Sequence, residues 1–105
     1  MISALEQRLM NALRDVEDPE LPLNVVDLGL IVALSVRDRT ATVDMTFTAM
    51  GCPAMDMLID DVRTRLSLEE DIDDVKVTVV WDPIWSVERI SHEGKAALRD
   101  FGIAI

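Results

Sequence analysis

The sequence predicts an α+β fold in two layers, in which a small mixed sheet carries helices packed on one face. Apolar residues recur at helical spacing near the N-terminus and again beyond residue 53, which predicts a helix in each place. Runs that alternate apolar and polar residues at 40–48 and 75–81 predict strands. A helix between two strands implies a crossover connection and some parallel pairing. Because 105 residues suffice for one core, we expect residues 1–105 to form a single domain.

The first helix is predicted over residues 4–17, and an acidic loop follows it. Ser3 and Glu6 form a capping-box pattern ahead of the apolar face. Asp18 is expected to end the helix, because the residue before a proline is pushed away from helical backbone angles. Residues 18–22 are therefore a predicted loop that carries two carboxylates, those of Asp18 and Glu20.

Two strands are predicted next, as an antiparallel hairpin. Residues 30–36 are almost wholly apolar and branched, as expected for a strand buried on both faces. A polar turn at 37–39 separates them from residues 40–48, where threonines and Asp44 alternate with apolar residues. This alternation predicts a strand with one face in water.

The second half of the chain repeats the alternation of helix and strand. A loop at 49–53 precedes an amphipathic helix that ends near Leu66, and the third strand follows at 75–81. The turn Trp81-Asp82-Pro83-Ile84-Trp85 breaks the strand pattern and suggests a fixed rim. After Ser86, a less regular helical segment is expected to end at Gly102.

The charge of the chain limits its partners. It has 20 acidic and 10 basic residues, a formal net charge of −10. This excess disfavours nucleic acid, whose binding depends on Lys and Arg displacing counterions. No apolar run approaches the roughly 20 residues of a membrane span, and the N-terminus lacks the pattern of a secretory signal. We therefore expect a cytoplasmic protein that binds neither nucleic acid nor membrane.

The only cysteine, Cys52, is the principal candidate for a functional group. Pro53 is favoured at the first position of a helix, which would make Cys52 the N-cap. Backbone N–H groups and the positive end of the helix dipole would then stabilise its thiolate, while Asp56 in the first turn would oppose it. Gly51 allows a close turn before it. The alternative interpretation is a buried cysteine that fills core space.

Other candidates carry a weaker signal. The carboxylates of Asp18, Glu20 and Asp27 could ligate a metal or tune the thiol, although acidic loop residues are usually solvated turn formers. The only histidine, His92, would have to reach Cys52 to form a nucleophilic pair. One thiol cannot hold a cluster that normally takes four protein ligands. If this protein handles iron–sulfur chemistry, the further ligands must come from a second subunit, a client or a small thiol.

Five blocks of residues follow one another along the chain: Asp18-Pro19-Glu20-Leu21, the stretch 24–31 (NVVDLGLI), Thr46-Phe47-Thr48 leading to Gly51-Cys52-Pro53, residues 81–85 (WDPIW), and Ile90-Ser91 with Gly94. Together, in this order, they resemble the SufT and PaaD-like family of metal–sulfur cluster biosynthetic proteins. The resemblance spans about residues 5–103, and the Trp-Asp-Pro-x-Trp turn is closer to the SufT side. Many relatives carry Thr-Pro where this chain has Ala49-Met50.

The resemblance implies an iron–sulfur cluster assembly domain that acts as an accessory factor rather than as an enzyme. The family's reactive cysteine falls on Cys52, its loop-shaping residues on Gly51 and Pro53, and the supporting residues on Asp18, Glu20, Asp27 and Thr48. Cys52 would ligate iron or an iron–sulfur cluster transiently. Assembly machinery and client apoproteins are the expected partners, and a homodimer is expected as well.

Two alternatives come from other functional classes. The chain could be a non-catalytic acidic interaction module with a structural cysteine, including a PaaD-like role in maturing a multicomponent oxygenase. It could also be a small thiol enzyme that uses Cys52 with His92.

Overall fold

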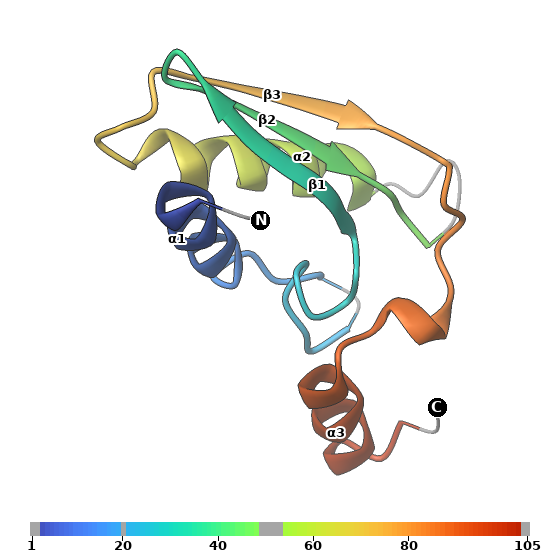
Figure 1. Cartoon of the computed structure of the whole chain (residues 1–105). Helices are drawn as coiled ribbons and strands as arrows, with labels where there is room; N and C mark the ends of the chain where they lie inside the picture. Colours follow the sequence, from blue (N-terminus) through green and yellow to red (C-terminus); the bar gives the residue numbers. More distant parts are fainter. Residues whose placement is uncertain (1–2, 20, 49–53, 104–105) are drawn as a thin grey trace.

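The computed structural model describes residues 3–19, 21–48 and 54–103, and its mixed sheet has the predicted order (Figure 1). Strand β1 (Ile31–Arg37) pairs antiparallel with β2 (Thr40–Met45), through a tight turn in which Asp38 and Arg39 both have positive φ. Helix α2 (Ala54–Ser67) then leads to β3 (Asp74–Val79), which pairs parallel with β2. The sheet order is β1-β2-β3, so the predicted hairpin and parallel pair are confirmed.

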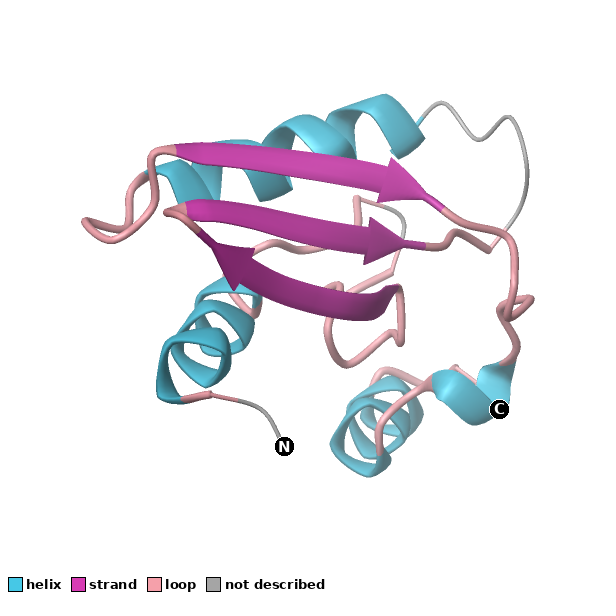
Figure 2. Ribbon diagram, turned by 45° about the horizontal axis from the view of Figure 1, so that its top comes forward, coloured by secondary structure: helices cyan, strands magenta, loops and turns pink. Residues whose placement is uncertain are grey.

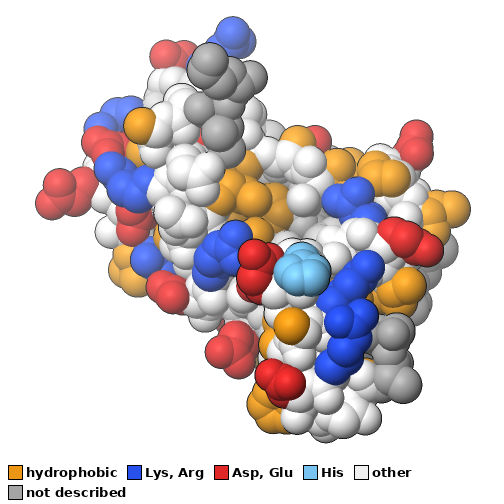
Figure 3. Space-filling model, turned by 60° about the horizontal axis from the view of Figure 1, so that its bottom comes forward, with side chains coloured by type: hydrophobic (Ala, Val, Ile, Leu, Met, Phe, Trp, Pro, Cys, Tyr) orange, Lys and Arg blue, Asp and Glu red, His pale blue; other side chains and the backbone are white. Residues whose placement is uncertain are grey.

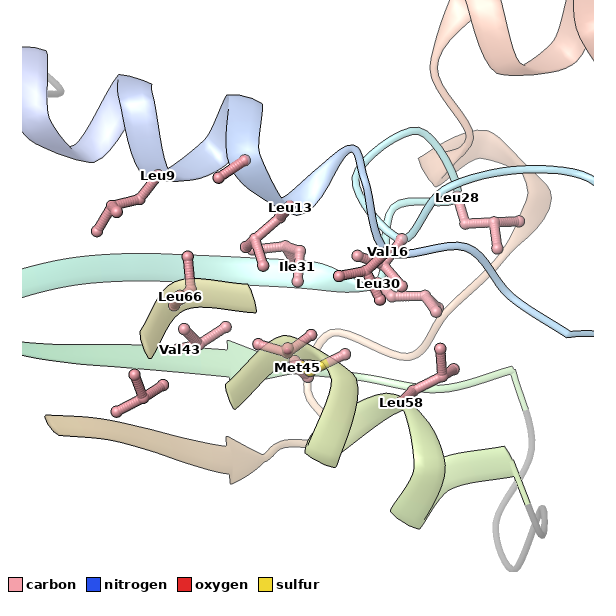
Figure 4. Packing of buried hydrophobic residues seen from close by; sticks show 14 of the residues in the cluster. Leu9, Leu13, Val16, Leu28, Leu30, Ile31, Val43, Met45, Leu58 and Leu66 are labelled. Carbon is pink, nitrogen blue, oxygen red and sulfur yellow. The ribbon is translucent and has the colours of Figure 1, made fainter. Parts of the chain in front are cut away.

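The hydrophobic core lies between one face of the sheet and two helices (Figure 4). Helix α1 (Ala4–Leu13) begins with the predicted capping box, in which Ser3 and Glu6 bond reciprocally. Both α1 and α2 lie on the same side of the sheet, and the other side faces outward (Figure 2). The two layers of the prediction are thus confirmed for these helices. The labelled core side chains include Leu9, Leu13, Val43, Met45, Leu58 and Leu66.

Strand β1 is not buried on both faces, as the sequence predicted. Its side chains alternate between the core and the open face, where Ala33 and Ser35 are exposed. The prediction was wrong because β1 is an edge strand and, within the described residues, no helix covers the second face. A run of branched apolar residues records strand propensity as well as burial.

Helix α1 ends at Leu13, four residues before the predicted end. After a turn at Arg14 and Asp15 the chain becomes extended, and Glu17 forms an antiparallel bridge with Asn24. The N–H of Val25 donates to the Val16 carbonyl at 2.9 Å, and that of Asp18 donates to Leu23 at 3.0 Å. These bonds require extended backbone at 16–18, so the helix does not continue through Val16 although Val16 stands at helical spacing.

The last helix, α3 (His92–Asp100), packs away from the sheet, below the loop that joins α1 to β1 (Figure 1). It begins after a single 3-10 turn at Val87–Arg89, and its cap is Ser91, whose hydroxyl accepts from the Gly94 N–H at 2.9 Å. The helical segment expected after Ser86 therefore begins there as a 3-10 turn, and its α-helical part begins at His92. A Cβ on Gly94 would lie 3.0 Å from Leu23, so α3 sits tightly on the loop.

Two arginines fasten α1 to the end of α2. Arg8 pairs with Glu69 at 3.2 Å and with Asp71 at 2.6 Å, while Arg65 pairs with Asp15 at 3.0 Å and with Glu69 at 2.9 Å.

Within the described residues, no helix is long and apolar enough to cross a membrane.

Of the three glycines in the described residues, Gly29 has the closest surroundings. Its φ is +77°, and a Cβ there would overlap the carbonyl oxygen of Arg89. Gly102 has a similar φ of +82°, but a Cβ there would meet nothing within 4 Å. Substitutions at the two glycines can therefore be compared: both meet the strain of a left-handed backbone, and only the one at Gly29 also meets steric overlap.

We expect Gly29→Ala to destabilise the protein by about 3 kcal/mol or more, because alanine adds overlap to a left-handed backbone. Gly102→Ala should cost only about 1 kcal/mol, the conformational part alone. Urea unfolding monitored by circular dichroism measures both. Equal losses for the two variants would show that the Gly29–Arg89 approach is unimportant.

Candidate functional site

The segment that carries Cys52 joins two well-packed elements. Gly51, Cys52 and Pro53 lie outside the described residues, so the prediction that Cys52 caps a helix stays a prediction. On one side the described chain ends with buried Phe47 and exposed Thr48. On the other side it resumes with buried Ala54, the first residue of α2.

Helix α2 gives this region its electrostatic character. The helix has 14 residues and starts two positions after Cys52. Four backbone N–H groups of its first turn have no partner within the helix, and the dipole concentrates partial positive charge there. Asp56, exposed in the first turn, adds a negative charge that opposes a thiolate. A nucleophilic or metal-binding thiol at this end would have backbone support and one opposing side chain.

Asp27 occupies a different place, at the junction of three segments. Its carboxylate accepts from Arg14 at 2.8 Å, from the Asn24 amide at 2.7 Å and from the Ser91 hydroxyl at 2.9 Å. The backbone N–H of Asp27 donates to Asn24 Oδ1 at 2.9 Å, and its carbonyl accepts from the Ser91 N–H at 2.8 Å. We call this set of bonds the Asp27 joint. It holds the end of α1, the following loop and the start of α3 together.

The Asp27 carboxyl is ionised at neutral pH despite its burial. Burial raises its pKa, but hydrogen bonds from Asn24, Ser91 and Arg14, with the charge of Arg14, outweigh that effect. The net pKa lies below the ordinary value. A carboxylate whose acceptor positions are already used is suited to holding structure, and its predicted role in supporting Cys52 stays untested.

Of the two acidic residues predicted on the loop, Asp18 is among the described residues and Glu20 is not. The carboxylate of Asp18 accepts from the Leu21 N–H at 3.1 Å, which closes a short turn, and Glu20 lies outside the described residues. In the parts of the chain that are described, no group of three His, Cys, Asp or Glu side chains is placed to hold a metal ion. His92 is exposed at the start of α3.

The sequence motif around the two tryptophans folds back onto the loop before β1. Trp85 donates from Nε1 to the Leu28 carbonyl at 2.7 Å, and Arg89 donates from Nε to the Gly29 carbonyl at 2.9 Å. The Trp81 ring packs against Phe47, with centroids 6.4 Å apart. Two of the recognised sequence blocks therefore meet in space, and the suggestion of a fixed rim is supported.

Thr46 is a residue that sequence reasoning placed wrongly. The alternation put it on the wet face of the strand, but its side chain is fully buried. Strand β2 ends at Met45, and the Thr46 N–H turns to donate to the Leu30 carbonyl at 2.8 Å. Its hydroxyl has no hydrogen-bond partner in the described structure. A buried hydroxyl without a partner costs about 1–3 kcal/mol of folding free energy. The only signal for the burial of Thr46 is that strand β2 ends just before it.

Comparison with known proteins decides the family. The model of the family described as "Iron-sulfur cluster assembly protein" matches residues 6–79. The chain belongs to this family. The resemblance to it that the motifs predicted is thus confirmed, and so is the link to the SufT side, through the relatives described next.

Three relatives show how much of the chain is shared. The iron–sulfur protein maturation auxiliary factor YitW of Bacillus subtilis is 36% identical over 99 residues, 93% of this chain and 97% of the relative. The auxiliary factor SufT of Staphylococcus aureus is 44% identical over 82 residues, 77% of this chain and 93% of the relative. A solved domain of unknown function from Bacillus anthracis is 38% identical, covers 91% of this chain and 92% of its own, and superposes with a TM-score of 0.87.

The hydrogen bonds of the Asp27 joint lead to a prediction about acid stability. Asp27→Asn should lower the free energy of unfolding by about 1–3 kcal/mol at pH 7, because the new amide N–H groups cannot accept from the donors that face it. The pKa of Asp27 is lower in the folded protein than the ordinary carboxyl value near 4 that it has in the unfolded chain. The extra unfolding free energy of wild type over Asp27→Asn is therefore complete above about pH 4, and it should disappear as the pH falls through the pKa of the folded protein.

Urea titrations at pH 7 and pH 3 measure this difference. Asp61→Asn, a change at an exposed carboxylate on α2, is the matched control and should have little effect at either pH. A gap between wild type and Asp27→Asn that persists unchanged at pH 3 would contradict the argument.

Proposed function

We propose that this protein is an accessory factor in iron–sulfur protein maturation, and that Cys52 transiently ligates iron or a cluster during transfer. Membership of the assembly family and similarity to the maturation auxiliary factors YitW and SufT support the role. The observation that carries the role of the thiol is its place in the chain. The only cysteine stands two residues before a 14-residue helix and five residues after the buried Phe47.

The chemistry requires only ligand exchange. The Cys52 thiol loses its proton to solvent, and the thiolate donates an electron pair to iron in place of a departing ligand. When a client thiolate displaces Cys52 in turn, the thiol is regenerated by a proton. Since clusters normally take four protein ligands, one thiol leaves the remaining positions to the donor, the client or a small thiol, which suits release.

The scaffold supplies order at both ends of the functional segment. Phe47 and Ala54 are both buried, and β2 and α2 each contribute to the same core. Functional residues in many proteins stand on a loop between elements of a rigid scaffold, and this place in the chain supports the proposal. Gly51 and Pro53 are proposed to shape the segment, and Thr48, Asp18, Glu20 and Asp27 to support it.

The proposed partners are the iron–sulfur assembly machinery and client apoproteins, and the chain acts as a maturation factor rather than as an enzyme. A homodimer and cytoplasmic residence stay predictions. The cluster or iron is cargo in this proposal, held only between donor and client.

The decisive variant is Cys52→Ser. Serine keeps the size and capping capacity of cysteine, but its oxygen is a poor ligand for iron that prefers thiolate. We expect client maturation to fall at least about tenfold, as measured by activity of an iron–sulfur enzyme in cells that depend on this protein.

Thermal unfolding of Cys52→Ser provides the control and should match wild type. Maturation equal to wild type would overturn the role of the thiol and favour the acidic interaction module. If Cys52→Ser loses both maturation and its fold, the loss of the ligand cannot be told from the loss of structure. Cys52→Ala then distinguishes the two, because it removes the ligand without adding a polar group.

The charge of Asp56 gives a second prediction. Asp56→Asn removes the negative charge in the first turn of α2, so the thiolate should form at lower pH. Alkylation by iodoacetamide, followed across pH, reports this directly because Cys52 is the only thiol.

Asp61→Asn is the control on the same helix, because Asp61 lies about 7 Å farther along the helix axis and its charge is more strongly screened. It should move the alkylation profile less. Equal shifts for the two variants would indicate a response to net charge rather than to the helix terminus.

A further inference from the structure

The stretch 81–88, called here the 81–88 segment, presents apolar side chains to solvent. Six large hydrophobic side chains are exposed in the described part of the chain, and three of them belong to this stretch. Trp81 is 37% exposed, Ile84 83% and Val87 45%, at intervals of three residues. The remaining three lie singly on other elements: Met57, Leu68 and Phe101. Exposed apolar residues concentrated on one short segment mark an interaction surface more often than scattered ones.

The segment is held in place by bonds that Trp85 and the residues just after the segment make to the loop before β1. Trp85 bonds to the Leu28 carbonyl, Arg89 bonds to that of Gly29, and the Ser91 N–H bonds to that of Asp27. At the other end, Trp81 packs on Phe47. A segment fixed at both ends loses little conformational entropy when a partner binds, which favours affinity.

The charges of the segment select the kind of partner. Asp82 and Glu88 are exposed, and residues 81–88 contain no basic residue. Hydrogen bonding to Ser86 lowers the pKa of Glu88, with a smaller contribution from the charge of Lys95. A two-fold contact between copies would place these carboxylates near their equivalents, within a chain of net charge −10, so a second copy fits poorly.

We propose that the 81–88 segment docks a client apoprotein through a region that has apolar side chains flanked by Lys or Arg. The proposal rests on the proposed function only in taking that polypeptide to be a client. Trp81 serves as the anchor at the Phe47 end of the segment, because tryptophan is enriched among residues that dominate binding. On the face shown in Figure 3, hydrophobic side chains lie among both acidic and basic ones, so the acidic character invoked here is that of residues 81–88 themselves. Docking here brings the client beside Phe47, from which the chain runs on toward Cys52.

Binding is tested with three synthetic helical peptides at about 0.15 M salt. The first has a leucine face flanked by lysines, the second replaces the lysines by glutamates, and the third replaces the leucines by serines. Only the first should bind to the full chain, with a blue shift of tryptophan emission. Equal binding of the first and third peptides, or no binding of the first, would overturn the proposal.

Two variants locate the surface. Ile84→Asp should weaken the leucine–lysine peptide at least about tenfold, because it puts charge into the apolar contact. Leu68→Asp is the matched control, since Leu68 is 73% exposed beyond the end of α2, and it should bind as wild type does. Equal weakening by the two variants would show a response to overall hydrophobicity or charge and would also overturn the proposal.

Client maturation separates this proposal from the proposed function. Ile84→Asp should reduce maturation while the alkylation profile of Cys52 stays unchanged. If Ile84→Asp binds the peptide and matures clients as wild type does, docking fails and the role of Cys52 stands. If Cys52→Ser alone is fully active, the role of the thiol fails and peptide binding still tests docking.

Discussion

The ionised carboxylate of Asp27 is the constraint on which the arrangement of the molecule depends. Its donors come from the end of α1, from the following loop and from the start of α3, which is 64 residues away in the chain. A buried carboxylate without donors would be very costly, so these segments are favourable only when assembled together. The Ser91 hydroxyl serves twice, because it donates to Asp27 and accepts from the first turn of α3. One side chain thereby sets the position of a helix that packs away from the sheet.

The features predicted from sequence are those that depend on near neighbours. The capping box of Ser3 and Glu6 and the core face of β2 follow from local spacing, and both are present. The end of α1 depends instead on the bridge between Glu17 and Asn24, and the burial of Thr46 depends on where β2 turns away. Local periodicity carries no information about either event, so the first helix was predicted too long and Thr46 was placed in water.

The candidate site shows the same division. A lone cysteine between a strand and an amphipathic helix can be recognised locally, as can the blocks of the family. The partners of Asp27 could not be, because acidic side chains in a loop have the same local pattern whether they bind metal, solvent or distant donors. Gly29 is similar: its need for no side chain arises from Arg89, 60 residues later. Several motif residues are therefore explained by packing, whereas Cys52 lies outside the described residues and its role stays a prediction.

The distribution of charge connects the thiol to the proposed docking surface. Among the described residues, Arg8, Arg14, Arg39 and Arg65 all pair with acidic side chains of the same chain, so much of the positive charge is used internally. The remaining acidic excess disfavours a thiolate, whose support must come from the nearby start of α2. A client that brings Lys or Arg to the 81–88 segment would instead offset the charges of Asp82 and Glu88, which belong to that segment. The thiol and the docking surface thus use charge differently: the thiolate needs local support against the acidic excess, whereas a basic client is attracted by it.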